Sequence, residues 1–129
     1  MSTREITTSK APKAIGPYSQ AIVSGDLIYC SGQIGLDPST TELVGGGITF
    51  ETKQVLSNIK EILEEAGSRI ENIIKTDIYL SDLKNFEIVN TIYGEFFNKE
   101  PYPARATIEV GGLPKGALIE IVCIATLKK

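Results

Sequence analysis

Two charged residues stand in apolar stretches of the C-terminal third of the chain, where a charge needs an explanation. Glu120 lies within the run ALIEIVCIATL, which is otherwise almost entirely apolar. A buried carboxylate is costly unless it is paired, hydrogen-bonded or protonated. Glu120 is therefore either half of an ion pair that joins strands or a general acid/base whose pKa is raised by burial.

Arg105 follows Pro103 and opens a second strand-like segment. In an extended chain Arg105, Thr107 and Glu109 share one face. A guanidinium keeps its charge, and its planar fork matches a carboxylate through two parallel hydrogen bonds. Arg105 is therefore either a structural partner of Glu109 or Glu120, or a clamp for the carboxylate of a small molecule.

Two shorter motifs are weaker signals. Gly16-Pro17-Tyr18-Ser19 is a rigid turn that carries a phenol, and such a tyrosine more often covers the edge of a core. Ser31-Gly32-Gln33 closes an apolar segment that begins at Leu27. A glycine there marks a β-bulge or the close approach of a ligand, and the bulge is favoured.

Several residue types are absent or scarce. The chain has no histidine, which excludes Ser-His-Asp and Cys-His catalysis and imidazole metal ligands. Cys30 and Cys123 are too few for a cysteine-only zinc site. Both lie in apolar runs, which is typical of buried, reduced thiols and favours a cytoplasmic location, although a disulfide stays open. We expect neither a metal nor a cofactor.

The composition is that of one globular domain spanning residues 1–129. Apolar residues make up 42% of the chain and charged residues 22%, with a net charge of -3. An acidic chain without a basic run lacks the electrostatic footprint for duplex DNA or an anionic membrane. The polar start and the lack of a long apolar run predict neither secretion nor membrane spanning.

The predicted elements run strands, helix, strand, helix and two strands. A stripe of apolar residues at helical period ends at Gly67, with Thr49 as the expected N-cap. Strands are expected at 22–23, 27–34, 73–80, 104–110 and 117–127, and a second helix after Ser81 or Asp82. Two helices can cover only one face of such a sheet, which predicts an α+β two-layer sandwich with a mixed, mainly antiparallel sheet.

The last predicted strand indicates self-association. Both of its faces are mainly apolar, so both should be buried. The helices bury one face, and a neighbouring subunit is the simplest cover for the other. Partial cover by loops is the alternative.

Taken together, these segments resemble the RidA (YjgF-type) family of reactive-intermediate deaminases. The matching motifs are AIGPYSQA at 14–21, SGQI at 31–34, PARATIEV at 103–110, and Leu113-Pro114 followed by IEI at 119–121. The resemblance implies a chorismate-mutase-like fold. It also implies a homotrimer with the sheets packed inward and a site in each cleft between subunits.

The reaction implied by the resemblance is hydrolysis of 2-imino acids, such as 2-iminobutanoate and 2-iminopropanoate, to 2-keto acids and ammonia without a cofactor. Arg105 matches the arginine that holds the substrate carboxylate, and Glu120 the carboxyl group that positions or activates water. Tyr18, Ser31 and Gly32 match pocket positions, and the backbone carbonyl of Thr107 would help to hold the water. Many relatives have Cys where this chain has Thr107, which argues against thiol chemistry at that position.

Two other classes of function stay open. The chain could be a non-enzymatic trimer that binds small carboxylates or acts as a chaperone. RNA cleavage or translational inhibition, reported for some family members, is disfavoured by the net charge of -3 and the absence of histidine.

Overall fold

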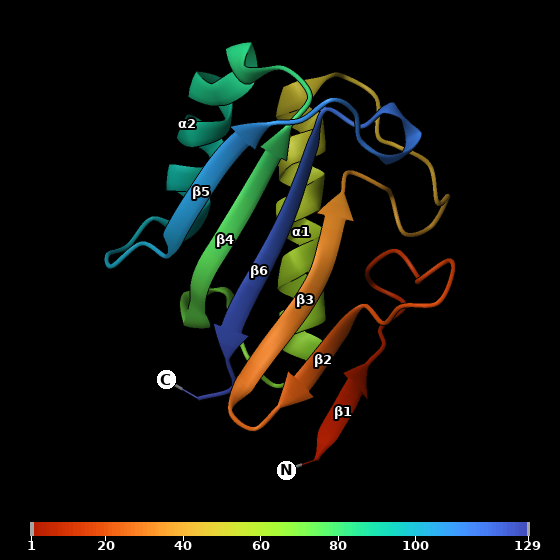
Figure 1. The fold of residues 1–129 in the computed structure, drawn as a ribbon, viewed down its shortest axis with the longest axis vertical. Coiled ribbons are helices and arrows are strands. Elements are labelled where there is room, and N and C mark those ends of the chain that lie inside the picture. Colours follow the sequence, from red (N-terminus) through yellow and green to blue (C-terminus); the bar gives the residue numbers. More distant parts are fainter. Residues whose placement is uncertain (1, 129) are drawn as a thin grey trace.

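A mixed β-sheet backed by two α-helices forms the molecule (Figure 1). The computed structural model describes residues 2–128, and six strands lie within them in the order β1-β2-β3-β6-β4-β5. β4 and β5 pair in parallel, and the other neighbours are antiparallel. The bounds are β1 Thr3–Ile6, β2 Ala21–Ser24, β3 Leu27–Ile34, α1 Ile48–Glu65, β4 Ile73–Leu80, α2 Phe86–Phe97, β5 Ala104–Glu109 and β6 Ile119–Thr126. The predicted α+β two-layer class is confirmed.

Helix α1 packs its apolar stripe against β3 and β6. The stripe of Val55, Leu56, Ile59, Ile62 and Leu63 is at most 3% exposed. The helix ends just before Gly67, whose φ of +86° is the left-handed conformation that favours glycine, as predicted. The expected cap at Thr49 is wrong, because the helix already begins at Ile48 after Gly47.

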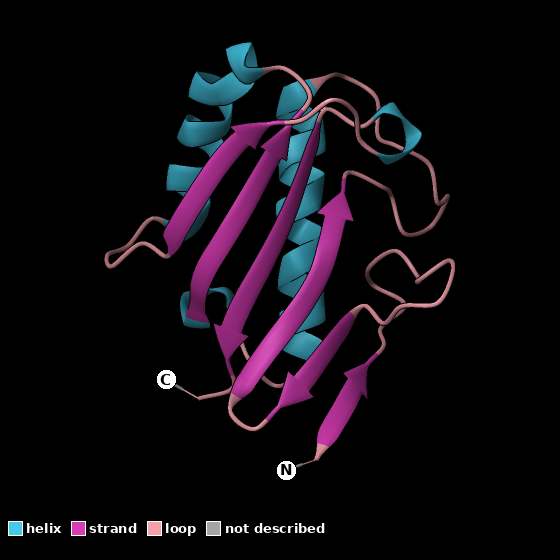
Figure 2. Ribbon diagram, in the orientation of Figure 1, coloured by secondary structure: helices cyan, strands magenta, loops and turns pink. Residues whose placement is uncertain are grey.

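Strand β6 lies in the middle of the sheet and shows which face the helices cover (Figure 2). Its odd-numbered residues from Ile119 to Ala125 are at most 1% exposed. Cys123 lies opposite Cys30 of β3, and both thiols are free and buried, as the sequence predicted. A hydrogen bond with Cys30 and burial raise the pKa of Cys123.

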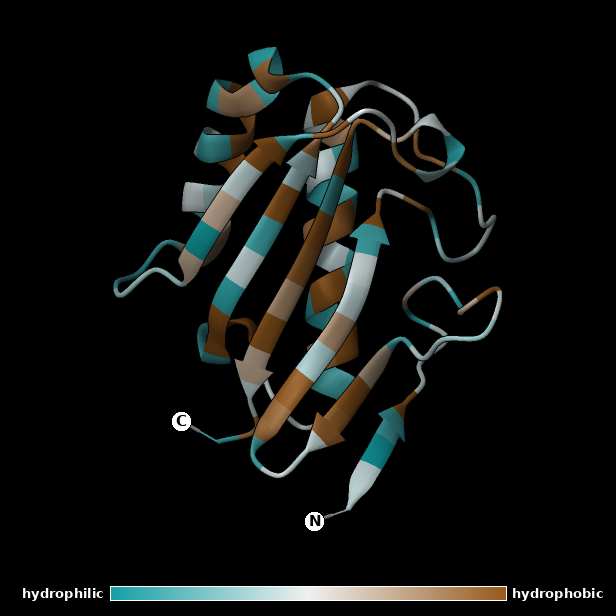
Figure 3. Cartoon of the chain, in the orientation of Figure 1, coloured by the Kyte–Doolittle hydropathy of each residue, from teal (hydrophilic) through white to brown (hydrophobic). Residues whose placement is uncertain are grey.

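The opposite face of the sheet, called here the open face, is covered by neither α1 nor α2 (Figure 1). The central strand β6 is hydrophobic over most of its length (Figure 3). Tyr29 and Ile108 are about half exposed there, while Val122 and Ile124 are partly buried.

Within residues 2–128, no helix combines the length and hydropathy that crossing a membrane requires.

Candidate active site

Glu120 and Gly32 meet on the open face, where β6 lies beside β3. One extra residue on β3 shifts the register between Cys30 and Gln33, which confirms the bulge expected at Gly32. A β-carbon added to Gly32 would come within 2.8 Å of the carboxyl carbon of Glu120. A side chain at position 32 would therefore displace the carboxyl end of Glu120, a contact that the sequence did not reveal.

A cavity of about 440 Å³ opens beside this contact. Its wall includes Tyr18, Gly32 and Glu120 together with apolar Pro12, Ile15 and Pro114. The sequence therefore identified three residues, Tyr18, Gly32 and Glu120, that the fold brings to one cavity. Its shape suits a small, partly apolar molecule.

Burial raises the pKa of Glu120 above the ordinary value of 4.5. Among residues 2–128, the ion pairs are Lys60–Glu64 and Lys75–Asp77, so Glu120 has no such partner there. The structural ion pair considered from the sequence is therefore not formed within the described chain. A half-buried carboxyl group of raised pKa can hold a water molecule and exchange protons with a bound ligand.

The turn that carries Tyr18 is fastened to β3 by Ser31. The Oγ of Ser31 donates a hydrogen bond to the carbonyl oxygen of Ser19 at 2.6 Å. The hydroxyl of Tyr18 accepts from the backbone N–H of Ile15 at 3.4 Å, while its ring stays about half exposed. Ser31 is thus placed to hold the turn against the sheet.

Gln20 is a supporting residue that the sequence analysis missed. Its buried amide donates hydrogen bonds to the carbonyl oxygens of Thr8, Ala11 and Pro12, and its Oε1 accepts from the N–H of Thr8. These bonds shape the loop that forms one wall of the cavity. A glutamine directly after the Gly-Pro-Tyr-Ser turn was the available signal.

Arg105 lies at another place, on the edge strand β5. Its guanidinium carbon is 5.0 Å from the ring centre of Tyr93 and 5.7 Å from that of Phe86, both on α2. The guanidinium group stacks on these two aromatic rings and forms no ion pair with an acidic side chain of residues 2–128. The pair with Glu109 is not formed, because Glu109 instead accepts a hydrogen bond from the backbone N–H of Leu83 at 2.8 Å.

Two buried polar atoms lie close to Arg105 without a hydrogen-bond partner in the described chain. One is Oδ1 of Asn90, a residue that lines a cavity of about 380 Å³ together with Arg105 and Tyr102. The other is Oγ1 of Thr107, a residue that borders an adjacent cavity beside Phe86. Buried polar atoms normally have partners, so this side of β5 is suited to a polar ligand.

Within one chain, Arg105 and Glu120 lie on opposite faces of the sheet. Arg105 is in register with Thr76 of β4, which is in register with Cys123 of β6 on the helix side. Glu120 is three residues from Cys123, so its side chain points to the open face. A single protomer therefore does not unite the predicted clamp and the predicted acid in one cavity.

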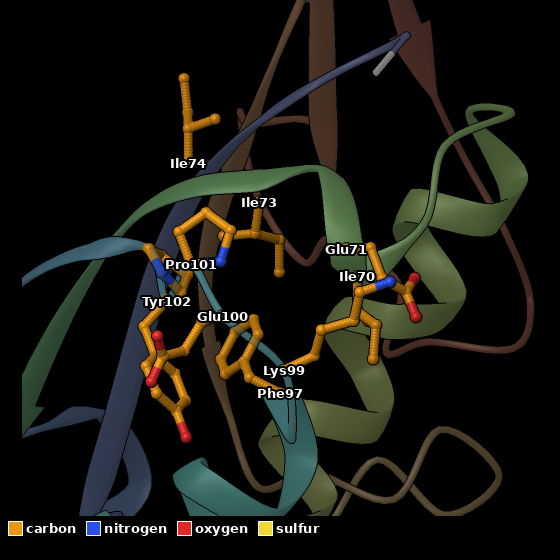
Figure 4. A pocket seen from close by; sticks show the side chains of 10 residues that line it. Ile70, Glu71, Ile73, Ile74, Phe97, Lys99, Glu100, Pro101 and Tyr102 are labelled. Atoms are coloured by element: carbon orange, nitrogen blue, oxygen red, sulfur yellow. The ribbon is translucent and has the colours of Figure 1, made fainter.

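A further cavity of about 250 Å³ lies where β4 and β5 begin, close to the end of α2. Figure 4 shows Ile70, Ile73 and Phe97 around it, with Ile74 pointing away. None of the residues predicted for the site lines this cavity.

Comparisons with known proteins agree with this arrangement of motifs. Residues 8–127 match the model of the family described as endoribonuclease L-PSP. A human protein named 2-iminobutanoate/2-iminopropanoate deaminase is 52% identical over 122 residues, which are 95% of this chain and 88% of that protein.

Solved structures are similar over nearly the whole chain. A conserved Rid family protein of Yersinia pestis superposes with a TM-score of 0.95 at 46% identity, covering 97% of this chain and 99% of the other. Escherichia coli TdcF with bound serine gives a TM-score of 0.91 at 36% identity, covering 95% and 98%. The chain belongs to the RidA (YjgF-type) family, described as endoribonuclease L-PSP.

Proposed function

We propose that this protein is a hydrolytic deaminase that converts 2-imino acids such as 2-iminobutanoate and 2-iminopropanoate to 2-keto acids and ammonia. The observation that carries the proposal is Glu120, a half-buried carboxyl group of raised pKa held against Gly32 in a cavity of about 440 Å³. The name of the human relative supports the same reaction.

The chemistry needs only the groups that this site offers. Protonation of the imine nitrogen makes the adjacent carbon electrophilic. Glu120 accepts a proton from water as its oxygen attacks that carbon, and the carboxyl group then returns a proton to the departing nitrogen. The carbon–nitrogen bond breaks as the new hydroxyl group becomes the keto oxygen, and its proton passes to the departing ammonia. One water molecule is consumed, and a keto acid and ammonium leave. Positioned acid–base help of this kind contributes about 10²–10⁴-fold.

The substrate carboxylate is assigned to Arg105 of a neighbouring subunit. Arg105 and Glu120 lie on opposite faces of one chain, so a shared site requires two chains. A homotrimer with the open faces packed inward would meet this need, and partly exposed Tyr29 and Ile108 on that face support it. The unpaired Thr107 and Asn90 oxygens beside Arg105 support a ligand there.

Two free buried thiols support a reducing compartment such as the cytoplasm.

The test is an assay in which a threonine dehydratase supplies 2-iminobutanoate and keto-acid release is followed. Purified protein should accelerate release, and both Arg105→Ala and Glu120→Gln should lose most of this acceleration. If keto acids bind while imine hydrolysis is unchanged, the protein is a non-enzymatic carboxylate binder instead.

Mixing the two inactive variants tests whether the site spans two chains. After co-refolding, a shared site is intact only where an Arg105 from one variant meets a Glu120 from the other. Random assortment of subunits then restores about a quarter of wild-type activity. No recovery, with mixed oligomers demonstrated by mass spectrometry, would place both residues in one chain's site and contradict the proposal.

RNA cleavage, which the family description mentions, has less support in this chain. The net charge is -3 and histidine is absent, whereas phosphate binding relies on clustered cations. Ribonuclease activity that co-purifies with the protein and disappears in Arg105→Ala would reverse this ranking.

A further inference from the structure

Two lysines line the cavity that contains Glu120. Lys13 lies in the loop before the Tyr18 turn, and Lys115 lies in the short 3-10 turn Pro114–Gly116. The whole chain carries a net charge of -3, yet this cavity has two ammonium groups and one carboxyl group. Two ammonium groups outnumber one carboxyl group, so the charged side chains that line this cavity have a positive balance.

The ammonium groups are not used to neutralise acidic side chains. Within residues 2–128, neither Lys13 nor Lys115 forms an ion pair with an aspartate or glutamate. Lys115 donates one long hydrogen bond, 3.5 Å, to the carbonyl oxygen of Thr41. The pKa of Glu120 stays raised with desolvation as its cause, so the lysines do not act as its counter-ions.

The backbone at Lys115 is a second, independent observation. Its φ is +59°, in the left-handed region that lysine rarely adopts, and its hydrogen-bond partner Thr41 has a φ of +61°. Non-glycine residues in this conformation cost free energy and cluster at ligand-binding positions. Lys115, which lines the cavity, thus combines a left-handed backbone with a contact to a second left-handed residue, Thr41.

We infer that this cavity accepts 2-imino acids whose side chain ends in a second carboxylate, and that Lys13 and Lys115 bind this distal group. The inference rests on the proposed function, in which Arg105 of the neighbouring subunit holds the first carboxylate. Lys13 and Lys115 can then bind a negative charge at the other end of the substrate. A cavity of about 440 Å³ has room for a five-carbon dicarboxylate.

A matched pair of substrates isolates the distal charge. 2-Iminoglutarate and 2-iminopentanoate have the same chain length, but one ends in a carboxylate and the other in a methyl group. An amino-acid oxidase can produce both in place, from glutamate and norvaline. The measured quantity is the ratio of kcat/KM for 2-iminoglutarate to that for 2-iminopentanoate.

The variants remove charge while keeping the fold. Lys13→Met preserves length, and Lys115→Asn places a residue that tolerates the left-handed backbone. Each should lower the ratio about two- to fivefold, as for a partly exposed ion pair, and both together about tenfold. Lys13→Arg should keep the ratio. Lys60→Met, on α1 and outside the cavity, should leave it unchanged.

Calorimetric binding of 2-oxoglutarate and 2-oxopentanoate separates this inference from the proposed function. If imine hydrolysis is absent but the lysines still favour 2-oxoglutarate, the deaminase is wrong and the subsite stands. If hydrolysis occurs and the ratio is the same in wild type and the double variant, the subsite is wrong. An equal loss of kcat/KM for both substrates in the double variant also overturns the subsite, because the lysines would then attract any anion.

Discussion

The carboxyl group of Glu120 lies directly against the backbone of Gly32, in space that a β-carbon would occupy. The φ of Gly32 is not in the left-handed region, so alanine can adopt the backbone there without strain. The three atoms nearest to such a β-carbon all belong to the side chain of Glu120. Gly32 thus sets the position of Glu120 in the cavity.

Gly32→Ala should therefore displace Glu120 while the fold survives. We expect kcat for imine hydrolysis to fall by about 10²-fold, the lower part of the range for acid–base help. Gly112→Ala is the matched control, because a β-carbon there meets nothing within 4 Å. Steady-state kinetics with circular dichroism as a fold check measures both. Equal activity in the two variants would contradict the positioning role.

Glu120→Gln should change stability in a pH-dependent way. Burial raises the pKa of Glu120 in the folded state above 4.5, whereas the unfolded state keeps the ordinary value. The folded state therefore binds more protons between the two pKa values, and wild-type stability falls as pH rises through that window. The variant should be more stable than wild type at neutral pH, and this advantage should disappear below the ordinary pKa.

Urea unfolding at fixed protein concentration across a pH series measures this difference. An advantage of Glu120→Gln that stays constant down to acidic pH would argue against ionisation of Glu120 as its cause.

Tyr93 should act on substrate affinity through Arg105. Its ring lies 5.0 Å from the guanidinium, and its hydroxyl hydrogen-bonds that of buried Thr76 at 2.7 Å. Tyr93→Leu removes the stacking, worth about 1 kcal/mol, so KM should rise about fivefold. Tyr93→Phe keeps the ring and should leave KM unchanged.

The hydrogen bond between Tyr93 and Thr76 gives a second readout, which is stability rather than activity. Tyr93→Phe leaves the Thr76 hydroxyl without its partner and should lower the free energy of unfolding by about 1–3 kcal/mol. If Tyr93→Phe raised KM as much as Tyr93→Leu, the hydroxyl rather than the ring would be the group that matters.

Ile124→Lys tests the packing of the open face. Ile124 lies on β6 between Tyr29 and Lys75 of the neighbouring strands. In a single chain the ammonium group of a lysine at this position would stay hydrated. Packing of the open face against another sheet would bury that charge, which is costly. We expect light scattering to show loss of the proposed trimer, and we expect deamination to be lost with it. Ile88→Lys, at an exposed position on α2, is the control and should retain both. A trimer that persisted in Ile124→Lys would mean that another surface joins the subunits.

Local patterns in the sequence were enough to predict most elements. The stripe of α1 and the alternation of β4 arise from neighbours in the chain, so their periods are visible without a partner. The short strand β1 was missed, because Thr3, Arg4 and Glu5 are polar and exposed and only pairing with β2 defines it. Thr49 failed as a cap for a similar reason, since the loop before α1 determined where the helix starts.

The chemistry of the site was also visible in part. The residue types of Glu120 and Arg105 predicted either structural ion pairs or functional groups. Their relative placement was not visible. Whether two side chains share a face depends on strand register, and the bulge at Gly32 and the pairings of β4 with β5 and β6 are long-range contacts. A one-residue shift turns every side chain of a strand over, so only the folded sheet could put Glu120 against Gly32 and Arg105 on the opposite face.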